Sequence, residues 1–494
     1  MWRVYIDGQL ISEVHVMSLK KNKSTTYLIS FLDERSLTLA ESIRKNDASQ
    51  KTKSNIIFTN IFSDKSLYNG LDKRAEQMGC KLSFEDICNI SLRKNSPHSL
   101  VRMVLINPDE NINLTVALTL AEQYRDKITA EIYVFAASKE SECLLDAVDK
   151  GGQYGVVPPL KIRRVNVVRN QIYAELLNNS LFNNAIEEYN EKVISVLIVG
   201  LGHYGTEMLK SILWCGQMVG YVLRVTVIDE SPDAEDIFYM QCPGIRERGT
   251  QPQNGEDYYE ITFYSGINVY SETFYNIIKT VPNTTQVFVA LGDERKSLET
   301  AMTLRTIFSG MQIDEGKTPS HAQSDVQKPR ITAVVYNNQK ANLLNQNKLA
   351  NFKGQYYNIK CMASNEELYS YNNIFASDLE EMALAAHLQW GDLETFNNYE
   401  YCRRSSMASA IHKKYRDELL KDNEELAAMA EHTRWNAYMR AVEGYSFGYI
   451  RDDLALRHSS LIRYSSLAPT EQAKDHRMNS YEIPKNTIKR NDNK

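Results

Sequence analysis

Three glycines near the middle of the chain have a spacing that suits contact with a phosphate group. Gly200, Gly202 and Gly205 end the apolar run 193–200 and open a helical pattern. The first glycine permits a tight turn, the second lets the backbone approach a pyrophosphate, and the third allows helix and strand to pack closely. The helix beginning near His203 would direct free N–H groups toward the phosphates. The pattern predicts a nucleotide or dinucleotide site, and the alternative is a turn retained only for packing.

Residues at two other predicted strand ends would border the same site. Asp229 ends the next strand, where its carboxylate would accept hydrogen bonds from an adenosine ribose and repel a 2′-phosphate, so NAD-like or adenosine ligands are favoured over NADP. Gly292 and Asp293 end the strand-like run 285–294 and could contact ligand, although Asp293 could equally be only the N-cap of the next helix. His203 could be an acid or base, or a solvent-facing residue at a helix start.

The rest of the chain carries no recognisable catalytic motif. The nine histidines show no HExxH pattern, and GxSxG, P-loop and CxxC patterns are absent. The seven cysteines are scattered, which fits reduced thiols and not a disulfide framework or zinc site. We therefore expect no catalytic residue and no metal ligand, and the pattern favours a binding protein over an enzyme.

Composition and charge narrow the class of protein. The chain has 494 residues, of which 43% are hydrophobic and 24% are charged, as in a soluble protein of several domains. Its net charge of −5 argues against general nucleic-acid binding, which needs a dense basic face. No apolar run approaches the roughly 18 residues of a membrane span, and no signal peptide is recognisable, so we expect a cytoplasmic location. A membrane partner is compatible with these features.

Alternating strand-like and helical patterns predict two successive α/β domains. The strand-like runs are continuously apolar, which is typical of strands buried on both faces of a parallel sheet. Residues 1–185 are predicted to form a Rossmann-like domain without the glycine turn, because SFLDERSL stands where the turn would be, and 193–370 a second domain with it. The segment 181–192 is predicted to be a helical connection. The predicted strands are 25–33, 54–62, 101–107 and 130–138, then 193–200, 221–230, 260–266, 285–294, 331–338 and 357–364.

The last part of the chain is predicted to be helical. No strand-like run follows residue 375, so a small, mostly α-helical domain is expected over 375–485. The polar stretches 242–257 and 314–329 are predicted surface loops, and 486–494 a frayed tail. The expected fold class is therefore α/β, with two tandem doubly wound Rossmann-like parallel-sheet domains followed by the helical domain.

The segment 193–300, which contains LIVGLGHYG, VIDE and VFVALGDE, resembles the TrkA-N (RCK-type) Rossmann domains that regulate potassium transport. In that family, tandem Rossmann units bind NAD, ATP or cyclic dinucleotides and transmit a change of state without hydride transfer. The resemblance implies a nucleotide ligand, and it implies a homodimer or higher homo-oligomer because RCK-type domains pair through their sheets and crossover helices. The first domain resembles the family in layout only.

A second unusual stretch is EELAAMAEHTRWNAYMRAVEGYSFG, residues 424–448. Its apolar positions follow helical spacing, and Gly444 ends the helical pattern. Glu431, Arg434 and Trp435 lie one turn apart on a shared side. One interpretation is an amphipathic helix with a Glu–Arg pair and a core tryptophan.

The same stretch closely resembles the signature of the RyR (ryanodine-receptor repeat) domain, which in bacteria reads approximately LAxxEHxRWxxxxxxxGWxYG. The resemblance extends over about 375–485 and implies a small helical domain that binds nucleotide-like ligands. In that domain an arginine could bind phosphate and a tryptophan could stack on a base. Tyr445 stands where the family pattern has Trp. The pocket residues that the resemblance implies are Glu431, His432, Arg434, Trp435 and Tyr445.

Together these features predict a non-catalytic protein that senses NAD or another adenine nucleotide, including a cyclic one. Bacterial fusions of this kind resemble conflict or anti-phage signalling proteins. One alternative is an NAD-dependent or NAD-consuming enzyme, with His203 or Asp293 beside the nicotinamide. Another is a soluble gating subunit of an ion channel or transporter.

Overall fold

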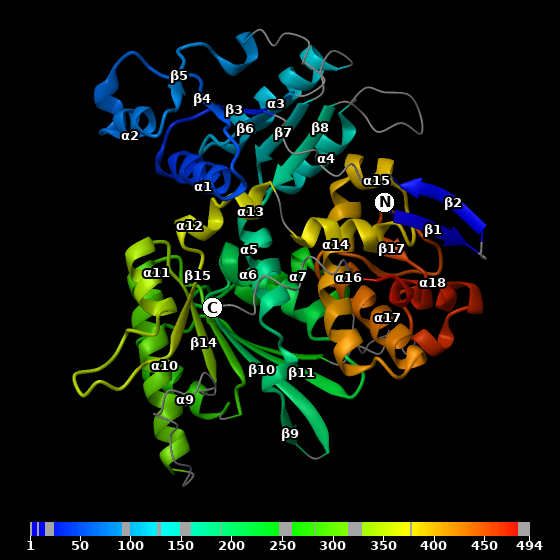
Figure 1. Ribbon diagram of the computed structural model, residues 1–494. Coiled ribbons are helices and arrows are strands. Elements are labelled where there is room, and N and C mark those ends of the chain that lie inside the picture. The colour runs from blue at the N-terminus through cyan, green and yellow to red at the C-terminus, as the bar shows by residue number, and fades with distance from the viewer. Residues whose placement is uncertain are drawn as a thin grey trace. The chain divides into compact units, whose positions relative to one another are not determined.

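The computed structural model describes residues 2–6, 9–14, 24–90, 99–125, 130–148, 160–188, 190–246, 259–281, 283–314, 329–375 and 378–482. The chain divides into two compact units (Figure 1). The first comprises Met1–Val165 with Tyr369–Tyr371, and the second comprises Asn166–Leu368 with Asn372–Lys494. Within the described ranges, no helix combines the length and the apolar character that crossing a membrane requires.

The first unit is built on a parallel sheet of six strands in the order β5-β4-β3-β6-β7-β8. In this order the first strand of the sheet lies beside the fourth, as in doubly wound Rossmann folds. An antiparallel hairpin, β1 (Trp2–Ile6) and β2 (Gln9–Val14), precedes the sheet. The strands of the sheet are β3 (Ser24–Ile29), β4 (Asn55–Phe58), β5 (Lys81–Leu82), β6 (Ser99–Leu105), β7 (Ala130–Phe135) and β8 (Leu160–Val165).

Both faces of this first sheet are buried. Met103 and Val134 share a core with helices α3 and α4, whereas Ile29 and Val104 point to the opposite face and are also completely buried. This is why the strands are continuously apolar in sequence. The helices are α1 (Glu34–Gln50), α2 (Leu71–Gln77), α3 (Glu110–Tyr124) and α4 (Lys139–Ala147), with 3-10 turns at Lys65–Tyr68 and Ile87–Asn89.

Residues from late in the chain complete the first unit. Tyr369 stacks on Phe135 with ring centroids 6.1 Å apart. The Tyr371 backbone N–H donates to Ser42 Oγ at 2.8 Å, and the Tyr371 hydroxyl accepts from Arg102 Nη1 at 3.3 Å. The chain therefore returns to the first unit after it has built the second sheet.

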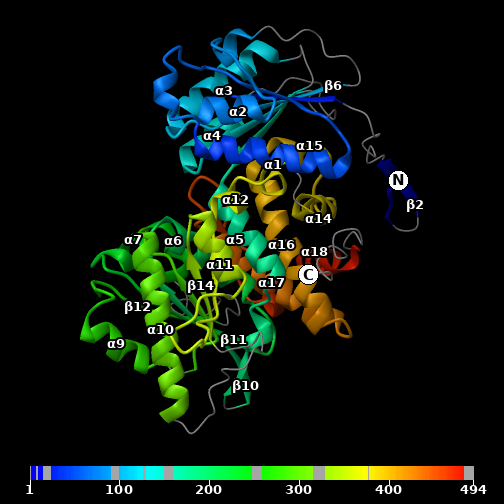
Figure 2. The ribbon, with the colours of Figure 1, turned by 60° about the vertical axis from the view of Figure 1, so that its left-hand side comes forward.

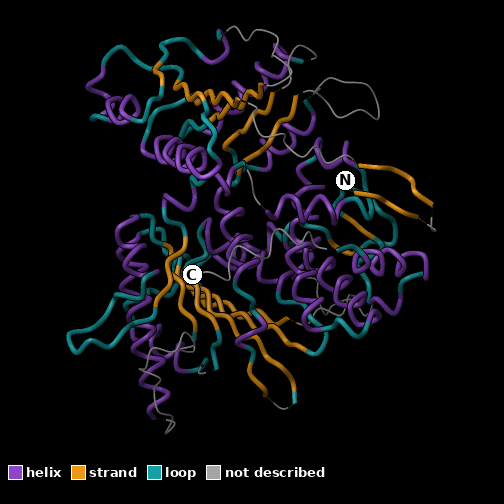
Figure 3. The backbone as a smooth tube through the Cα atoms, in the orientation of Figure 1, coloured by secondary structure: helices purple, strands orange, loops and turns teal. Residues whose placement is uncertain are grey.

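The second unit repeats the strand order of the first, as β12-β11-β10-β13-β14-β15. Val199 pairs with Ile228 on one side and Val289 on the other, so three strands end together at one edge of the sheet. The strands are β10 (Glu191–Val199), β11 (Tyr221–Ile228), β12 (Tyr259–Tyr264), β13 (Gln286–Val289), β14 (Arg330–Val334) and β15 (Ile359–Met362). Figure 3 shows the strands of each unit gathered into a twisted sheet.

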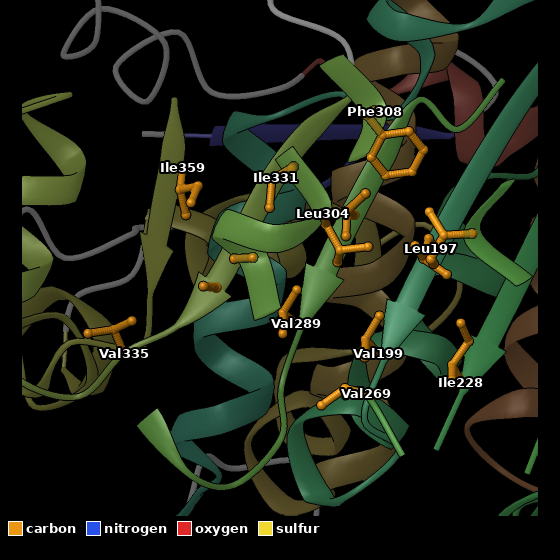
Figure 4. Close-up of a cluster of buried hydrophobic side chains, with 14 of the residues drawn as sticks. Leu197, Val199, Ile228, Val269, Val289, Leu304, Phe308, Ile331, Val335 and Ile359 are labelled. Atoms are coloured by element: carbon orange, nitrogen blue, oxygen red, sulfur yellow. The ribbon is translucent and has the colours of Figure 1, made fainter. Parts of the chain in front are cut away.

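Helices cover the second sheet as well. Leu304 and Phe308 of α10 pack with Val199, Val289 and Ile331 in one buried apolar cluster (Figure 4). Helices α9 and α11 contribute to the same cluster. The helices that follow the strands are α6 (His203–Cys215), α7 (Ala234–Gln241), α8 (Pro243–Arg246), α9 (Glu272–Lys279), α10 (Glu294–Asp314), α11 (Asn338–Asn345) and α12 (Asn365–Leu368).

The prediction of a helical connection over 181–192 is wrong. A single 3-10 turn (Phe182–Asn184) is followed by β9 (Ile186–Glu188), which pairs antiparallel with the start of β10. Strand pairing replaces the helix here, and Glu188 also forms an ion pair with Arg224 of β11. The segment is therefore an extension of the second sheet.

Helix α5 (Val167–Asn178) follows β8 directly but belongs to the second unit. Tyr173 meets Trp214 of α6 edge to face at 5.4 Å, and Glu175 forms an ion pair with Arg330 at 2.8 Å. These contacts, all within the second unit, account for the assignment of α5 to that unit.

The carboxyl-terminal region is mostly helical and packs on α5 and α6. In Figures 1 and 2 its two longest helices, α16 and α17, lie across the second sheet from α10. A two-residue strand pair, β16 (Ser446–Phe447) and β17 (Arg457–His458), is an exception to the expectation that no strand follows residue 375. The helices are α13 (Tyr371–Ile374), α14 (Asp378–His387), α15 (Leu393–Asn398), α16 (Glu400–Leu419), α17 (Glu424–Ala441) and α18 (Pro469–Ser480), with a 3-10 turn at Tyr464–Ser466.

The fold class predicted from sequence is confirmed: two Rossmann-like sheets, each with six parallel strands, precede a helical region. Most of the predicted loops 242–257 and 314–329, and the whole predicted tail 486–494, lie outside the described residues.

Candidate functional site

The glycine turn joins β10 to α6 at the carboxyl edge of the second sheet, and the protein itself requires two of its three glycines. Gly200 has a φ of +95°, and a Cβ there would lie 2.3 Å from the carbonyl oxygen of Ala290. A Cβ at Gly205 would lie 1.8 Å from the carbonyl oxygen of Gly200. Close packing of the turn therefore excludes a side chain at both positions.

Gly202 differs from the other two, because the protein does not require glycine there. Its φ is −65°, and a Cβ would meet no atom within 4 Å apart from its chain neighbours. Gly202 is the N-cap of α6, so no side chain caps the first N–H groups of that helix. Gly202 and His203 are both exposed. The positive end of α6 is therefore open toward solvent, where an anion can approach it.

The amino end of α6 also lies where the strand order of the sheet reverses. Helices α6 and α10 leave the ends of the adjacent strands β10 and β13, and the strand order reverses between these two strands. In open α/β sheets, ligands bind in the crevice outside the strand ends at this reversal. The glycine turn thus lies at the point where a doubly wound sheet offers a ligand site.

Asp229 lies beside the glycine turn, as its place at the end of β11 predicts. One carboxylate oxygen accepts the backbone N–H of Leu201 at 2.5 Å, and the other accepts that of Ser231 at 2.7 Å. The side chain therefore fixes the turn to the loop that follows β11. Each carboxylate oxygen can accept a second hydrogen bond, so a ribose hydroxyl could share the same group.

Gly292 and Asp293 also lie at this edge of the sheet, because the Ala290 carbonyl group just before them packs against Gly200. Gly292 is exposed and has a φ of +77°. Asp293 Oδ1 accepts the backbone N–H of Lys296 at 2.6 Å, which makes Asp293 the cap of α10. Of the two roles weighed for Asp293 from sequence, the capping role is present in the structure.

Sequence reasoning missed a polar bridge over the same edge. Lys296 Nζ lies 2.7 Å from Glu230 Oε2, and Asn268 Nδ2 donates to Glu230 Oε1 at 2.8 Å. The ion pair with Lys296 lowers the pKa of Glu230. Because Glu230 is exposed, this bridge is weak and can open for a ligand. Its only sequence signal is a second acid directly after Asp229.

The amino-terminal turns of α6 carry a half-buried ion pair as well. Arg169 Nε of α5 lies 3.1 Å from Glu207 Oε2 of α6. Burial alone would raise the pKa of Glu207, but the Arg169 guanidinium outweighs that effect and lowers it. Within the described ranges, no group of three or more His, Cys, Asp or Glu side chains could hold a metal ion.

The corresponding turn of the first unit is closed by its own side chains. Asp33 caps α1 by accepting the Ser36 backbone N–H at 2.9 Å. Arg35 Nε donates to the same carboxylate at 2.7 Å. The Asp33 carboxylate thus accepts an N–H group at the amino end of α1, where a phosphate would otherwise bind. This is the physical consequence of the sequence SFLDERSL in place of a glycine turn.

The structure separates the candidate residues of the carboxyl-terminal helix into two groups, of which the first is internal. Glu431 and Arg434 are each 2% exposed, and Arg434 Nη2 donates to Glu431 Oε1 at 2.8 Å. Arg416 of α16 also binds the Glu431 carboxylate. Burial alone would raise the pKa of Glu431, but the two guanidinium groups lower it to about 2. These residues form the Glu–Arg pair of the first interpretation and are not open to a ligand.

The second group is aromatic and half-buried. Trp435 meets His458 edge to face at 5.0 Å, and Tyr445 lies 6.3 Å from the same imidazole. His432 is buried, stacks on Trp435 at 5.8 Å and has its Nε2 2.9 Å from the Ile462 carbonyl oxygen. Burial lowers the pKa of His458 to about 4, so its ring is neutral at physiological pH. Sequence reasoning missed His458, which reaches the group only through the β16–β17 pairing.

Comparison with known proteins adds no argument about function. No protein-family model matches the chain, and no curated protein matches it. Among solved structures, a glycosyltransferase from Rickettsia africae ESF-5 aligns with 81% of this chain and 100% of its own, at 10% identity and a TM-score of 0.20.

Proposed function

We propose that this protein is a non-catalytic sensor that binds NAD or another adenine nucleotide at the carboxyl edge of the second sheet. The observation that carries the proposal is Gly202. Packing explains Gly200 and Gly205, but it does not explain a glycine whose Cβ would face open space. A phosphate group on the N–H groups of His203 and Tyr204 explains it, because a side chain at position 202 would keep the phosphate away.

In this proposal the diphosphate lies at the amino end of α6 and the adenosine ribose lies near Asp229. The backbone N–H groups supply charge-assisted hydrogen bonds in the proposed complex. The carboxylate of Asp229 is already held by the N–H groups of Leu201 and Ser231, so it is oriented before the ribose arrives. A preoriented acceptor costs less entropy on binding than a free side chain does.

The same helix offers a route from the ligand to the carboxyl-terminal region. Trp214 of α6 lies 6.4 Å from Tyr438 of α17, and His412 of α16 is bonded to the Gln217 carbonyl just beyond α6. We propose that ligand binding is read out through these contacts. We also propose a second ligand site at Trp435 and Tyr445, as the RyR resemblance implies. The same proposal includes a homodimer, a cytoplasmic location and a role in anti-phage signalling.

Native mass spectrometry tests this function. At least one of three samples, the protein as purified and the protein after addition of ADP or of NAD, should carry an adduct of adenine-nucleotide mass. Absence of any such adduct in all three samples would contradict the proposal. NAD turnover that His203→Ala abolishes would instead support the alternative of an NAD-using enzyme.

A further inference from the structure

A pair of tyrosines joins the first turn of α6 to the loop that follows β14. Tyr204 is the second residue of α6 and is 8% exposed. Its ring centroid lies 6.1 Å from that of Tyr336, which follows β14, and the ring planes meet at 63°. Tyr204 follows the carboxyl end of β10 and Tyr336 that of β14, and β13 lies between these strands, so the contact joins the two halves of the sheet at its carboxyl edge.

The loop that carries Tyr336 is held in place by several contacts. Glu294 Oε2 accepts the backbone N–H of Asn337 at 2.8 Å, and Glu294 Oε1 forms an ion pair with Lys340. The Tyr336 carbonyl accepts the backbone N–H of Asn365 at 3.1 Å. These contacts fix the backbone that carries Tyr336 to both α10 and α12, and the ring itself packs on Tyr204. The Glu230–Lys296 bridge on the adenosine side is exposed at Glu230 and can open at a smaller cost.

A dinucleotide uses both halves of a doubly wound sheet, with one nucleoside over each half and the pyrophosphate between them. We propose that Tyr204 and Tyr336 occupy the place of the second nucleoside, so that the site accepts an adenosine 5′-mono- or diphosphate and rejects NAD. This inference rests on the proposed function and makes its ligand more specific. Tyr336 is then a specificity-determining residue, because it closes one half of the site and leaves the helix end at Gly202 open.

Calorimetric titration of the full chain with ADP and with NAD tests this assignment. The wild type should bind ADP at least about tenfold more tightly than NAD, because NAD must displace a packed ring. Tyr336→Ala should raise the affinity for NAD by about tenfold and leave that for ADP within about twofold. Tyr336→Phe keeps the ring and is the matched control, which should behave as the wild type does.

Each outcome bears on a different claim. Equal affinities of the wild type for ADP and NAD would overturn the inference and leave the proposed function standing. An unchanged ratio in a folded Tyr336→Ala variant would do the same, with near-ultraviolet circular dichroism as the measure of folding. Failure of the wild type to bind either nucleotide would overturn the proposed function, and the inference with it.

Discussion

Replacement of Glu431 by glutamine tests whether the charged residues of α17 stabilise the helical region. The carboxylate is 2% exposed and is bonded to Arg416, Arg434 and Ser409. A pKa of about 2 in place of 4.5 corresponds to about 3 kcal/mol in favour of the charged form. Loss of one partner from a buried ion pair costs about 3–5 kcal/mol. We therefore expect Glu431→Gln to lower the free energy of unfolding by about 3 kcal/mol at neutral pH.

Urea unfolding followed by tryptophan fluorescence measures this effect in the relevant unit, since Trp214, Trp390 and Trp435 all belong to the second unit. Glu425→Gln is the matched control, because its side chain lies on the same helix and is 63% exposed. The lowered pKa means that the contribution of Glu431 is complete above pH 4.5 and is lost as the pH falls through about 2. A loss equal to that of the control would refute the structural role and return Glu431 to the ligand candidates.

Two further predictions concern the turn and a buried histidine. Gly205→Ala should lower the free energy of unfolding by about 2 kcal/mol or more, because the methyl group would lie 1.8 Å from the Gly200 carbonyl oxygen. Gly202→Ala should lower it by no more than about 1 kcal/mol, the usual cost of alanine at an N-cap, and equal effects of the two would show that the turn is packed differently. Burial lowers the pKa of His387 to about 4 from 6.5, so its contribution to stability is complete above pH 6.5 and is lost as the pH falls toward 4. Chemical unfolding of the wild type should show a loss of about 3 kcal/mol over this window that His387→Gln lacks; an identical pH dependence in the variant would contradict this assignment.

Much of the fold could be predicted from the sequence because burial on both faces leaves a strong signal. The apolar runs that become β3, β6, β10 and β11 cannot be accommodated in any exposed strand. The strand β8 has no such signal, since LKIRRV alternates apolar and basic residues. Its Arg164 is nevertheless buried, because Glu142 of α4 pairs with it at 2.7 Å. Such a pair depends on the tertiary structure and cannot be recognised in the sequence.

The sequence also predicted part of the candidate site, namely which residues lie at the same edge of the sheet. The spacing of the glycines and the place of Asp229 were sufficient to bring these residues to one edge of the sheet. The use of Asp229 to hold the Leu201 N–H could not be predicted, because it depends on how two loops meet. The contact between Tyr204 and Tyr336 joins residues that are distant in sequence and carry no motif. The burial of Glu431 and Arg434 likewise follows from the packing of α16 on α17.

The central claim is that the open amino end of α6 binds the phosphate of an adenine nucleotide. Calorimetric titration of ADP into the wild type and into Gly202→Val tests it most directly, because the Cβ at position 202 would meet open space and no neighbouring atom of the protein. The account predicts a folded protein that is about 1 kcal/mol less stable, because valine is a poor N-cap, together with a loss of affinity of about tenfold or more, the equivalent of one charge-assisted hydrogen bond. Equal affinity of the two proteins for ADP would contradict it.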